Sequence, residues 1–144
     1  MRIYLDNCCY NRPFDPQTDL RISLETAAKL RVQDLMRSGV VEYVWSEVLD
    51  YELSKSPNYQ EPDMIGPWRT DAVENVAVDD AVIDRGEEIE RMGINAMDAL
   101  HLASAETAGC DWFLTTDKGI LKKLRLLGAM RVANPIDFVM EDSE

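Results

Sequence analysis

The sequence is poor in the residues that define several protein classes. It has three cysteines in 144 residues, and two of them, Cys8 and Cys9, are adjacent. No CxxC or Cys/His spacing typical of a zinc site is present. This odd number of thiols argues against a disulfide framework and favours the reducing cytoplasm. We expect Cys8 and Cys9 to pack beside the first strand rather than to react.

Long apolar runs are also missing, although 46% of the residues are hydrophobic. No run reaches the roughly 18 residues that a membrane span needs. An acid at position 6 comes too early for a signal peptide, and residues 3–5 are typical of a first strand. We therefore expect no membrane segment. A single domain over residues 1–140 with one hydrophobic core is predicted, followed by a frayed acidic tail at 141–144.

Positive charge is scarce, with 15 Lys and Arg against 27 Asp and Glu and a formal net charge of −12. Such a surface is poorly suited to holding nucleic acid by charge alone. Composition leaves two interpretations open. The protein is an acidic one that never meets a polyanion, or its carboxylates gather where metal ions neutralise them.

The order of the predicted elements favours an α/β fold. Strands are predicted at residues 3–5, 40–45, 75–78, 112–114 and 130–132. Helices are predicted at 18–38, 46–54, 79–92, 95–108 and 120–127, with loops at 7–16 and at 57–73, the latter with at most a short helix. This alternation predicts a mostly parallel sheet covered by helices on both faces.

Three acids converge in this arrangement. Asp6 directly follows the strand at 3–5, and Asp117 follows the strand at 112–114 by three residues. The carboxyl ends of parallel strands share one edge of a sheet. Asp98 lies in the first turn of the helix at 95–108, which runs back antiparallel to the next strand, so this turn returns to the same edge. Each acid alone has an ordinary role as a turn or helix-start residue. Their coincidence predicts a site.

Clustered carboxylates repel one another unless a cation intervenes. A hard divalent ion such as Mg²⁺ prefers oxygen ligands, and at such a site it activates water and stabilises displacement at a phosphodiester. A fourth acid on the helix at 46–54 is predicted less sharply. The spacing places Glu47 and Glu52 equally well. The carboxylates therefore predict a site for Mg²⁺ or Mn²⁺.

Four blocks of the sequence together resemble a PIN domain: IYLDNCCYNRPFD, SEVLDYELS, NAMDALHLASA and DWFLTTDKGIL. The resemblance spans about residues 2–140. It implies a three-layer α/β/α sandwich that binds Mg²⁺ or Mn²⁺ and cleaves RNA, commonly single-stranded, as an endoribonuclease. It also implies homodimerisation. The VapC-like bacterial members are toxins of type II toxin–antitoxin pairs, which implies an antitoxin partner. The acids that match the family are Asp6, Glu52, Asp98 and Asp117.

The resemblance thus favours Glu52 over Glu47. It also implies that a hydroxyl of Thr115 or Thr116 orients a ligand or water. Asn7 and Asn95 either hydrogen-bond the carboxylates or simply form turns and caps. The two cysteines after the first acid depart from the small polar residues usual in that loop.

Other residues have weaker claims to function. The densest basic group could hold RNA phosphates or form a solvated helix face, and it comprises Lys118, Lys122, Lys123 and Arg125. Arg12 has a similar claim beside Asp6. Trp68 could stack on a base. The only histidine, His101, lies one helical turn beyond Asp98, and we expect it to be packed or hydrogen-bonded rather than a ligand.

Two rival classes of function are a phosphotransfer domain and a non-catalytic binding module. A haloacid-dehalogenase-type phosphatase needs DxD after its first strand, and Asp6-Asn7-Cys8 does not supply it. A receiver domain needs an acceptor aspartate that closes a middle strand, and no such residue is present. A non-catalytic PIN-like module that binds a protein partner is the remaining alternative, and the presence of all four acids argues against it. The sequence thus predicts a cytoplasmic metal-dependent ribonuclease.

Overall fold

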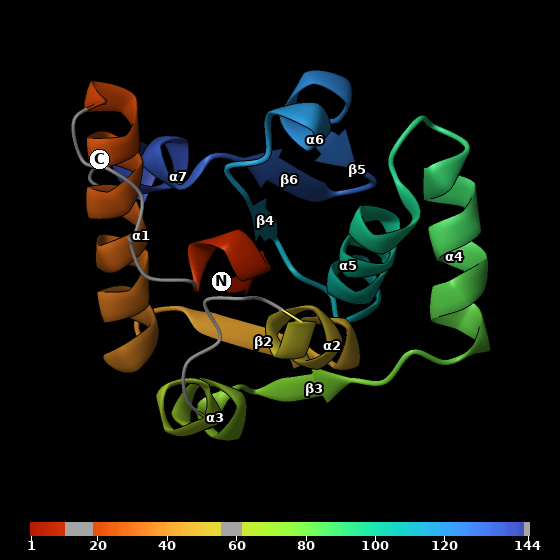
Figure 1. Cartoon of the computed structure of the whole chain (residues 1–144), viewed down its shortest axis with the longest axis horizontal. Coiled ribbons are helices and arrows are strands. Elements are labelled where there is room, and N and C mark those ends of the chain that lie inside the picture. Colours follow the sequence, from red (N-terminus) through yellow and green to blue (C-terminus); the bar gives the residue numbers. More distant parts are fainter. Residues whose placement is uncertain (11–18, 56–61, 143–144) are drawn as a thin grey trace.

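The computed structural model describes residues 1–10, 19–55 and 62–142 (Figure 1). Its centre is a six-stranded sheet with the order β3-β2-β1-β4-β6-β5. The strands are β1 (Arg2–Leu5), β2 (Glu42–Ser46), β3 (Glu74–Val76), β4 (Trp112–Leu114), β5 (Leu126–Leu127) and β6 (Met130–Ala133). All neighbours pair in parallel except β5, which runs antiparallel to β6. The mostly parallel sheet predicted from the sequence is confirmed.

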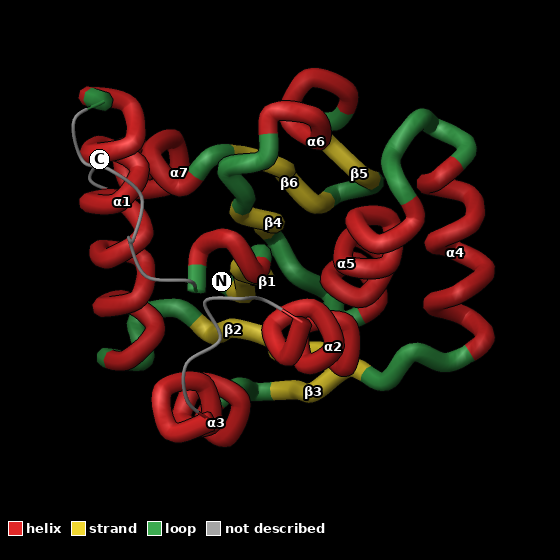
Figure 2. Tube along the Cα trace, in the orientation of Figure 1, coloured by secondary structure: helices red, strands yellow, loops and turns green. Residues whose placement is uncertain are grey.

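Helices cover both faces of this sheet (Figures 1 and 2). They are η1 (Asn7–Cys9, a 3-10 turn), α1 (Leu20–Arg37), α2 (Glu47–Lys55), α3 (Pro62–Asp71), α4 (Asp80–Glu90), α5 (Ala96–Thr107), α6 (Lys118–Lys123) and α7 (Pro135–Asp142). Helices α1 and α7 pack together on one side, and α4 and α5 pack together on the other. The three-layer α/β/α sandwich is therefore confirmed. None of the described helices combines the length and apolarity needed to cross a bilayer.

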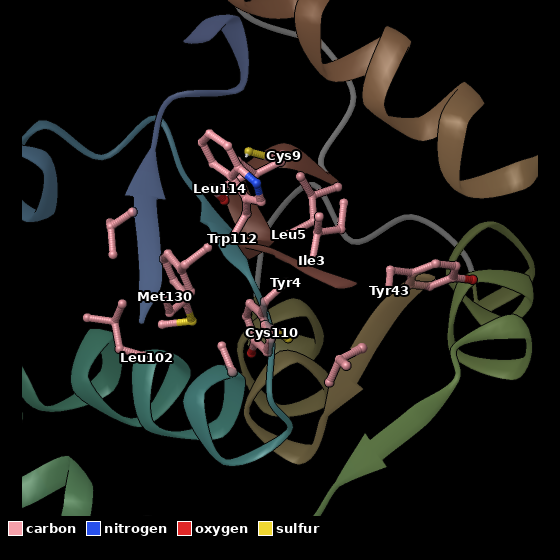
Figure 3. Packing of buried hydrophobic residues seen from close by; sticks show 14 of the residues in the cluster. Ile3, Tyr4, Leu5, Cys9, Tyr43, Leu102, Cys110, Trp112, Leu114 and Met130 are labelled. Atoms are coloured by element: carbon pink, nitrogen blue, oxygen red, sulfur yellow. Dashed lines mark hydrogen bonds between the residues drawn. The ribbon is translucent and has the colours of Figure 1, made fainter. Parts of the chain in front are cut away.

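The two faces are visible in how the central strands pack (Figure 3). The β1 side chains Ile3, Tyr4 and Leu5 are all fully buried, as expected of a strand covered on both sides. Tyr4 stacks on Phe113 of β4 with ring centroids 5.3 Å apart. On the other side of β4, Trp112 meets Phe138 of α7 edge-on. Alternate side chains thus build two separate halves of the core.

Local signals set most helix ends where the sequence predicts them. The Asp19 carboxylate accepts hydrogen bonds from two backbone N–H groups at the start of α1. The Asp79 carboxylate and the Asn95 amide oxygen each accept one backbone N–H at the start of α4 and α5. Gly93 and Gly109 follow α4 and α5 with φ of 95° and 72°, a conformation that glycine adopts without strain. These caps orient α5 so that its first turn returns to the carboxyl edge of the sheet.

Two predicted loops differ in the structure. The segment 57–73, predicted as a loop with at most a short helix, contains the ten-residue α3. Pro62 occupies its first position, where a missing N–H costs nothing. Trp68 of α3 packs edge-on against the rings of Tyr10 and Tyr43, a long-range contact that the sequence pattern did not reveal. The part of the 7–16 loop that the structure describes forms η1.

The C-terminal segment also differs. The helix predicted at 120–127 is α6, which begins at Lys118 and ends at Lys123. Leu127 is instead buried in β5, where a turn at Gly128 pairs it with Met130. Helix α7 was not predicted, and it continues through Asp142 into the segment expected to fray. Its burial of Phe138 against the sheet explains why it forms.

Candidate functional site

Asp6 lies at the carboxyl end of β1 and is 3% exposed. Its Oδ1 accepts a hydrogen bond from the Asn7 backbone N–H at 2.8 Å. Its Oδ2 accepts another from the Thr115 hydroxyl at 2.7 Å. Burial raises the pKa of Asp6 despite these neutral donors. A cation next to this buried carboxylate would stabilise its charged form.

Thr115 connects two of the acidic positions. Its buried hydroxyl donates to Asp6 and accepts the backbone N–H of Asp117 at 3.0 Å. The end of β1 is thus coupled to the loop after β4. Thr116, in contrast, directs its hydroxyl to the Cys8 sulfur at 3.3 Å. Of the two threonines predicted to orient a ligand, Thr115 hydrogen-bonds a site carboxylate, whereas Thr116 hydrogen-bonds Cys8.

Glu52, on α2, completes a tight group with Asp6 and His101. Each of these three side chains offers one ligand-type atom, and the atoms lie within 4.8 Å of one another. Glu52 Oε1 contacts His101 Nε2, and the Asn7 amide nitrogen is 3.5 Å from Oε2. Glu47 is exposed, and its carboxylate accepts the Val78 backbone N–H. The structure therefore brings Glu52, and not Glu47, to Asp6.

Asp98 and Asp117 form the open half of the site. Both line a cavity of about 160 Å³ together with Asn95 and Lys123. Asp98 stands in the first turn of α5, where Asn95 accepts its backbone N–H and donates to its Oδ2 at 2.8 Å. Asp117 caps α6 through the N–H groups of Gly119 and Ile120. The sequence argument that α5 returns to the edge holding Asp117 is confirmed.

The negative charges of these acids are not balanced by an ion pair with Lys or Arg among the described residues. Burial, followed by the charges of Asp6 and Asp117, raises the pKa of Asp98 to about 6. Over the described parts of the chain, no Lys or Arg forms an ion pair with Asp6, Glu52, Asp98 or Asp117. The donor set is rich in carboxylate oxygen, which suits a hard divalent cation. The residues present therefore fit Mg²⁺ or Mn²⁺.

His101 is fully buried, and both ring nitrogens are hydrogen-bonded, as the sequence interpretation expected. Its Nδ1 lies 2.6 Å from the Tyr4 hydroxyl, and its Nε2 contacts Glu52. The contact with Glu52 was not predicted. The available signal was its position three residues after Asp98, which puts both side chains toward one side of α5.

The proposed RNA-contacting residues are only partly described. Lys118 and Lys122 are exposed on α6, beside Asp117, whereas Arg12 lies outside the described residues. Lys123, from the same basic group, lines the cavity of Asp98 and donates to the Gly93 carbonyl at 2.6 Å. The Trp68 ring packs against aromatic neighbours, and the Arg37 guanidinium lies over it.

A comparison with known protein families identifies the family of this chain. The family model described as PIN domain matches residues 42–126, more than half of the chain. The chain belongs to the PIN domain family. The matched segment includes three of the four acids, Glu52, Asp98 and Asp117, whereas Asp6 precedes it. No curated protein sequence matches the chain.

Solved structures share the PIN fold over nearly their whole length. VapBC2 from Rickettsia felis bound to a promoter DNA fragment aligns with a TM-score of 0.59 at 14% identity, covering 93% of this chain and 98% of that one. FitAcB from Neisseria gonorrhoeae gives 0.58 at 17%, with 92% and 97% covered. DNA-bound VapBC from Salmonella typhimurium gives 0.58 at 14%, with 94% and 98% covered. At these identities the likeness concerns the fold.

Proposed function

We propose that this PIN domain is an endoribonuclease that depends on Mg²⁺ or Mn²⁺ and cleaves single-stranded RNA. One observation carries the proposal. Four acids from distant parts of the chain, Asp6, Glu52, Asp98 and Asp117, gather at one sheet edge without a described Lys or Arg ion pair. Without a cation, burial and mutual repulsion favour protonation and raise the pKa of Asp98 to about 6. A bound divalent ion would offset this repulsion, which supports cation binding.

The divalent ion would supply Lewis-acid stabilisation and an activated water for attack on the phosphodiester. The protein's own groups define where that chemistry takes place. Thr115 and the Asn7 backbone orient the Asp6 carboxylate, and Asn95 orients Asp98. Lys118 and Lys123 provide positive charge beside Asp117 for a substrate phosphate. Because the net charge is −12, non-specific affinity is expected to be low, which favours a narrow path for a single strand.

We further propose that the nuclease is the toxin of a type II toxin–antitoxin pair. The similar structures are VapBC and FitAB-type complexes, so the fold is one seen together with a partner chain. A cytoplasmic location, homodimerisation and a cognate antitoxin follow as parts of the same proposal. A short neighbouring reading frame that encodes a DNA-binding protein would support it. Its absence would restrict the proposal to the nuclease.

The sharpest test compares two acids on one helix. Glu52→Gln removes the carboxylate next to Asp6, whereas Glu47→Gln removes an exposed carboxylate elsewhere on α2. We expect wild type and Glu47→Gln to bind Mn²⁺ in calorimetry and to cleave a fluorescent single-stranded RNA. Glu52→Gln should lose more than about 10-fold in Mn²⁺ affinity. Chelation by EDTA should stop cleavage in both active proteins.

Two outcomes would contradict the proposal. Equal behaviour of the two variants would remove Glu52 from the site. Binding of Mn²⁺ without hydrolysis of any RNA would favour the alternative, a non-catalytic module that acts through a protein partner.

A further inference from the structure

A chain of buried hydrogen bonds runs from the backbone of α2 to the acidic site. The Leu49 backbone N–H donates to Ser46 Oγ at 3.1 Å. Ser46 Oγ lies 2.7 Å from Tyr4 Oη, which in turn lies 2.6 Å from His101 Nδ1. The other ring nitrogen, Nε2, contacts Glu52 Oε1. Ser46, Tyr4 and His101 are all fully buried, so water does not replace these partners.

The chemistry of the groups sets the direction of this chain. A carboxylate only accepts hydrogen bonds, so His101 Nε2 must carry a proton. In a neutral imidazole Nδ1 is then an acceptor, and the Tyr4 hydroxyl donates to it. The Ser46 hydroxyl is left to donate to Tyr4 Oη. The Tyr4 hydroxyl thus donates to Nδ1 and accepts from Ser46, which uses both of its hydrogen-bonding functions.

The reverse directions leave groups unsatisfied. A proton on Nδ1 alone would bring the lone pair of Nε2 against the Glu52 carboxylate. With protons on both nitrogens, Tyr4 would donate to Ser46, and the Ser46 hydroxyl would need a further acceptor. No such acceptor is described in the resolved network around Ser46. One direction therefore satisfies every member of the chain.

We propose that His101 is a positioning residue for Glu52. Its Nε2–H engages Oε1, whereas Oε2 has only the Asn7 amide nitrogen, at 3.5 Å, as a described partner. The orientation is transmitted from the α2 backbone through Ser46 and Tyr4. The inference rests on the proposed function in one respect, which is that Glu52 is a metal-binding carboxylate. A neutral donor orients this carboxylate without neutralising it, so the site retains its charge for a hard cation.

The competing role for His101 is direct ligation, because its Nε2 lies in the group with Asp6 and Glu52. The two roles require opposite tautomers when metal is bound. A positioning His101 keeps its proton on Nε2. A ligating His101 offers the Nε2 lone pair to the ion and carries its proton on Nδ1.

Imidazole nitrogen NMR distinguishes these tautomers, and the chain has one histidine, so the signals need no further assignment. We expect the Nε2–H tautomer in the metal-free protein and no change of tautomer at saturating Mg²⁺. Tyr4→Phe removes the donor to Nδ1 and should shift these signals. Tyr43→Phe is the matched control, because the Tyr43 hydroxyl donates to the Trp68 carbonyl instead. A proton on Nδ1, with or without Mg²⁺, would overturn the proposal.

Mn²⁺ affinity provides the second measurement. His101→Leu removes the donor, and we expect a 10- to 100-fold loss of affinity, as is typical for partners that orient a ligand. His101→Gln retains an amide N–H that can reach Glu52, and it should recover most of the affinity. Equal loss in both folded variants would refute positioning through an N–H donor. Because neither measurement uses RNA, failure of the ribonuclease proposal would leave this result interpretable.

Discussion

The two edges of the sheet treat charge in opposite ways. At the amino edge, Arg2 pairs with Glu42 and Glu74, and Arg131 pairs with Glu141. The Arg2 backbone N–H also donates to Asp111. At the carboxyl edge, Asp6, Glu52, Asp98 and Asp117 face one another and have neutral donors such as Thr115, Asn7 and Asn95.

This difference separates charges that are paired with Lys or Arg from charges that have no such partner among the described residues. Exposed ion pairs at the amino edge contribute little to stability and have no need of an exogenous ion. The carboxyl edge places acids where burial and mutual repulsion raise the pKa of Asp98 to about 6. An arrangement that destabilises the metal-free fold is expected where a cation is to be bound. The following experiments compare the two edges directly.

The largest expected effect is on catalysis. Asp6→Asn at the carboxyl edge should reduce Mn²⁺-dependent RNA cleavage by more than about 100-fold, because it removes the charge of a proposed metal ligand. Substitution of residues that merely orient a ligand already costs about 10- to 100-fold. Asp111→Asn at the amino edge should leave the rate unchanged. Initial rates at saturating Mn²⁺ measure both. A comparable loss in Asp111→Asn would erase the distinction between the edges.

A stability effect of intermediate size is expected at Thr115. Thr115→Val keeps the shape of the side chain and removes the hydroxyl shared by Asp6 and the Asp117 N–H. The free energy of unfolding should fall by about 1–3 kcal/mol, the cost of leaving buried polar groups unpaired. Urea denaturation measures the change. Thr116→Val is the control, and a fall as large as that of Thr115→Val would contradict the assigned role.

A pH dependence is expected from Asp98. Its raised pKa means that the folded, metal-free protein binds a proton more tightly than the unfolded chain between pH 4 and about 6. The stability contributed by protonation is therefore lost as pH rises through this window. Asp98→Asn should match wild type near pH 4 and become the more stable protein by pH 7. Denaturation at several pH values in EDTA tests this, and a difference independent of pH would refute it.

The smallest effect is expected at the amino edge. Glu42→Gln breaks an ion pair with Arg2 whose side chains are 32% and 54% exposed. The free energy of unfolding should change by no more than about 1 kcal/mol, and the difference should shrink in high salt. Denaturation at two salt concentrations measures it. A larger, salt-insensitive change would show that this edge is also electrostatically specialised.

Much of the site could be predicted because its signals are local. Asp6 follows a short apolar strand, and Asn95 marks the start of α5 three residues before Asp98. Parallel strands then bring these positions to one edge. The helix α3 could not be predicted, because Trp68 packs on rings from residues far away in the sequence. The same holds for β5, where Leu127 is buried by pairing with β6.

The sequence by itself determined the alternation of strands and helices, their caps, and therefore the edge at which the acids gather. These properties depend on periodicity and on neighbours within one or two turns. Spacing left Glu47 and Glu52 equal, the family resemblance favoured Glu52, and the tertiary structure placed Glu52 beside Asp6. Only the tertiary structure connected Tyr4, His101 and Glu52. The reason is geometric. A hydrogen bond between three separate elements depends on how they pack, and no single segment encodes that distance.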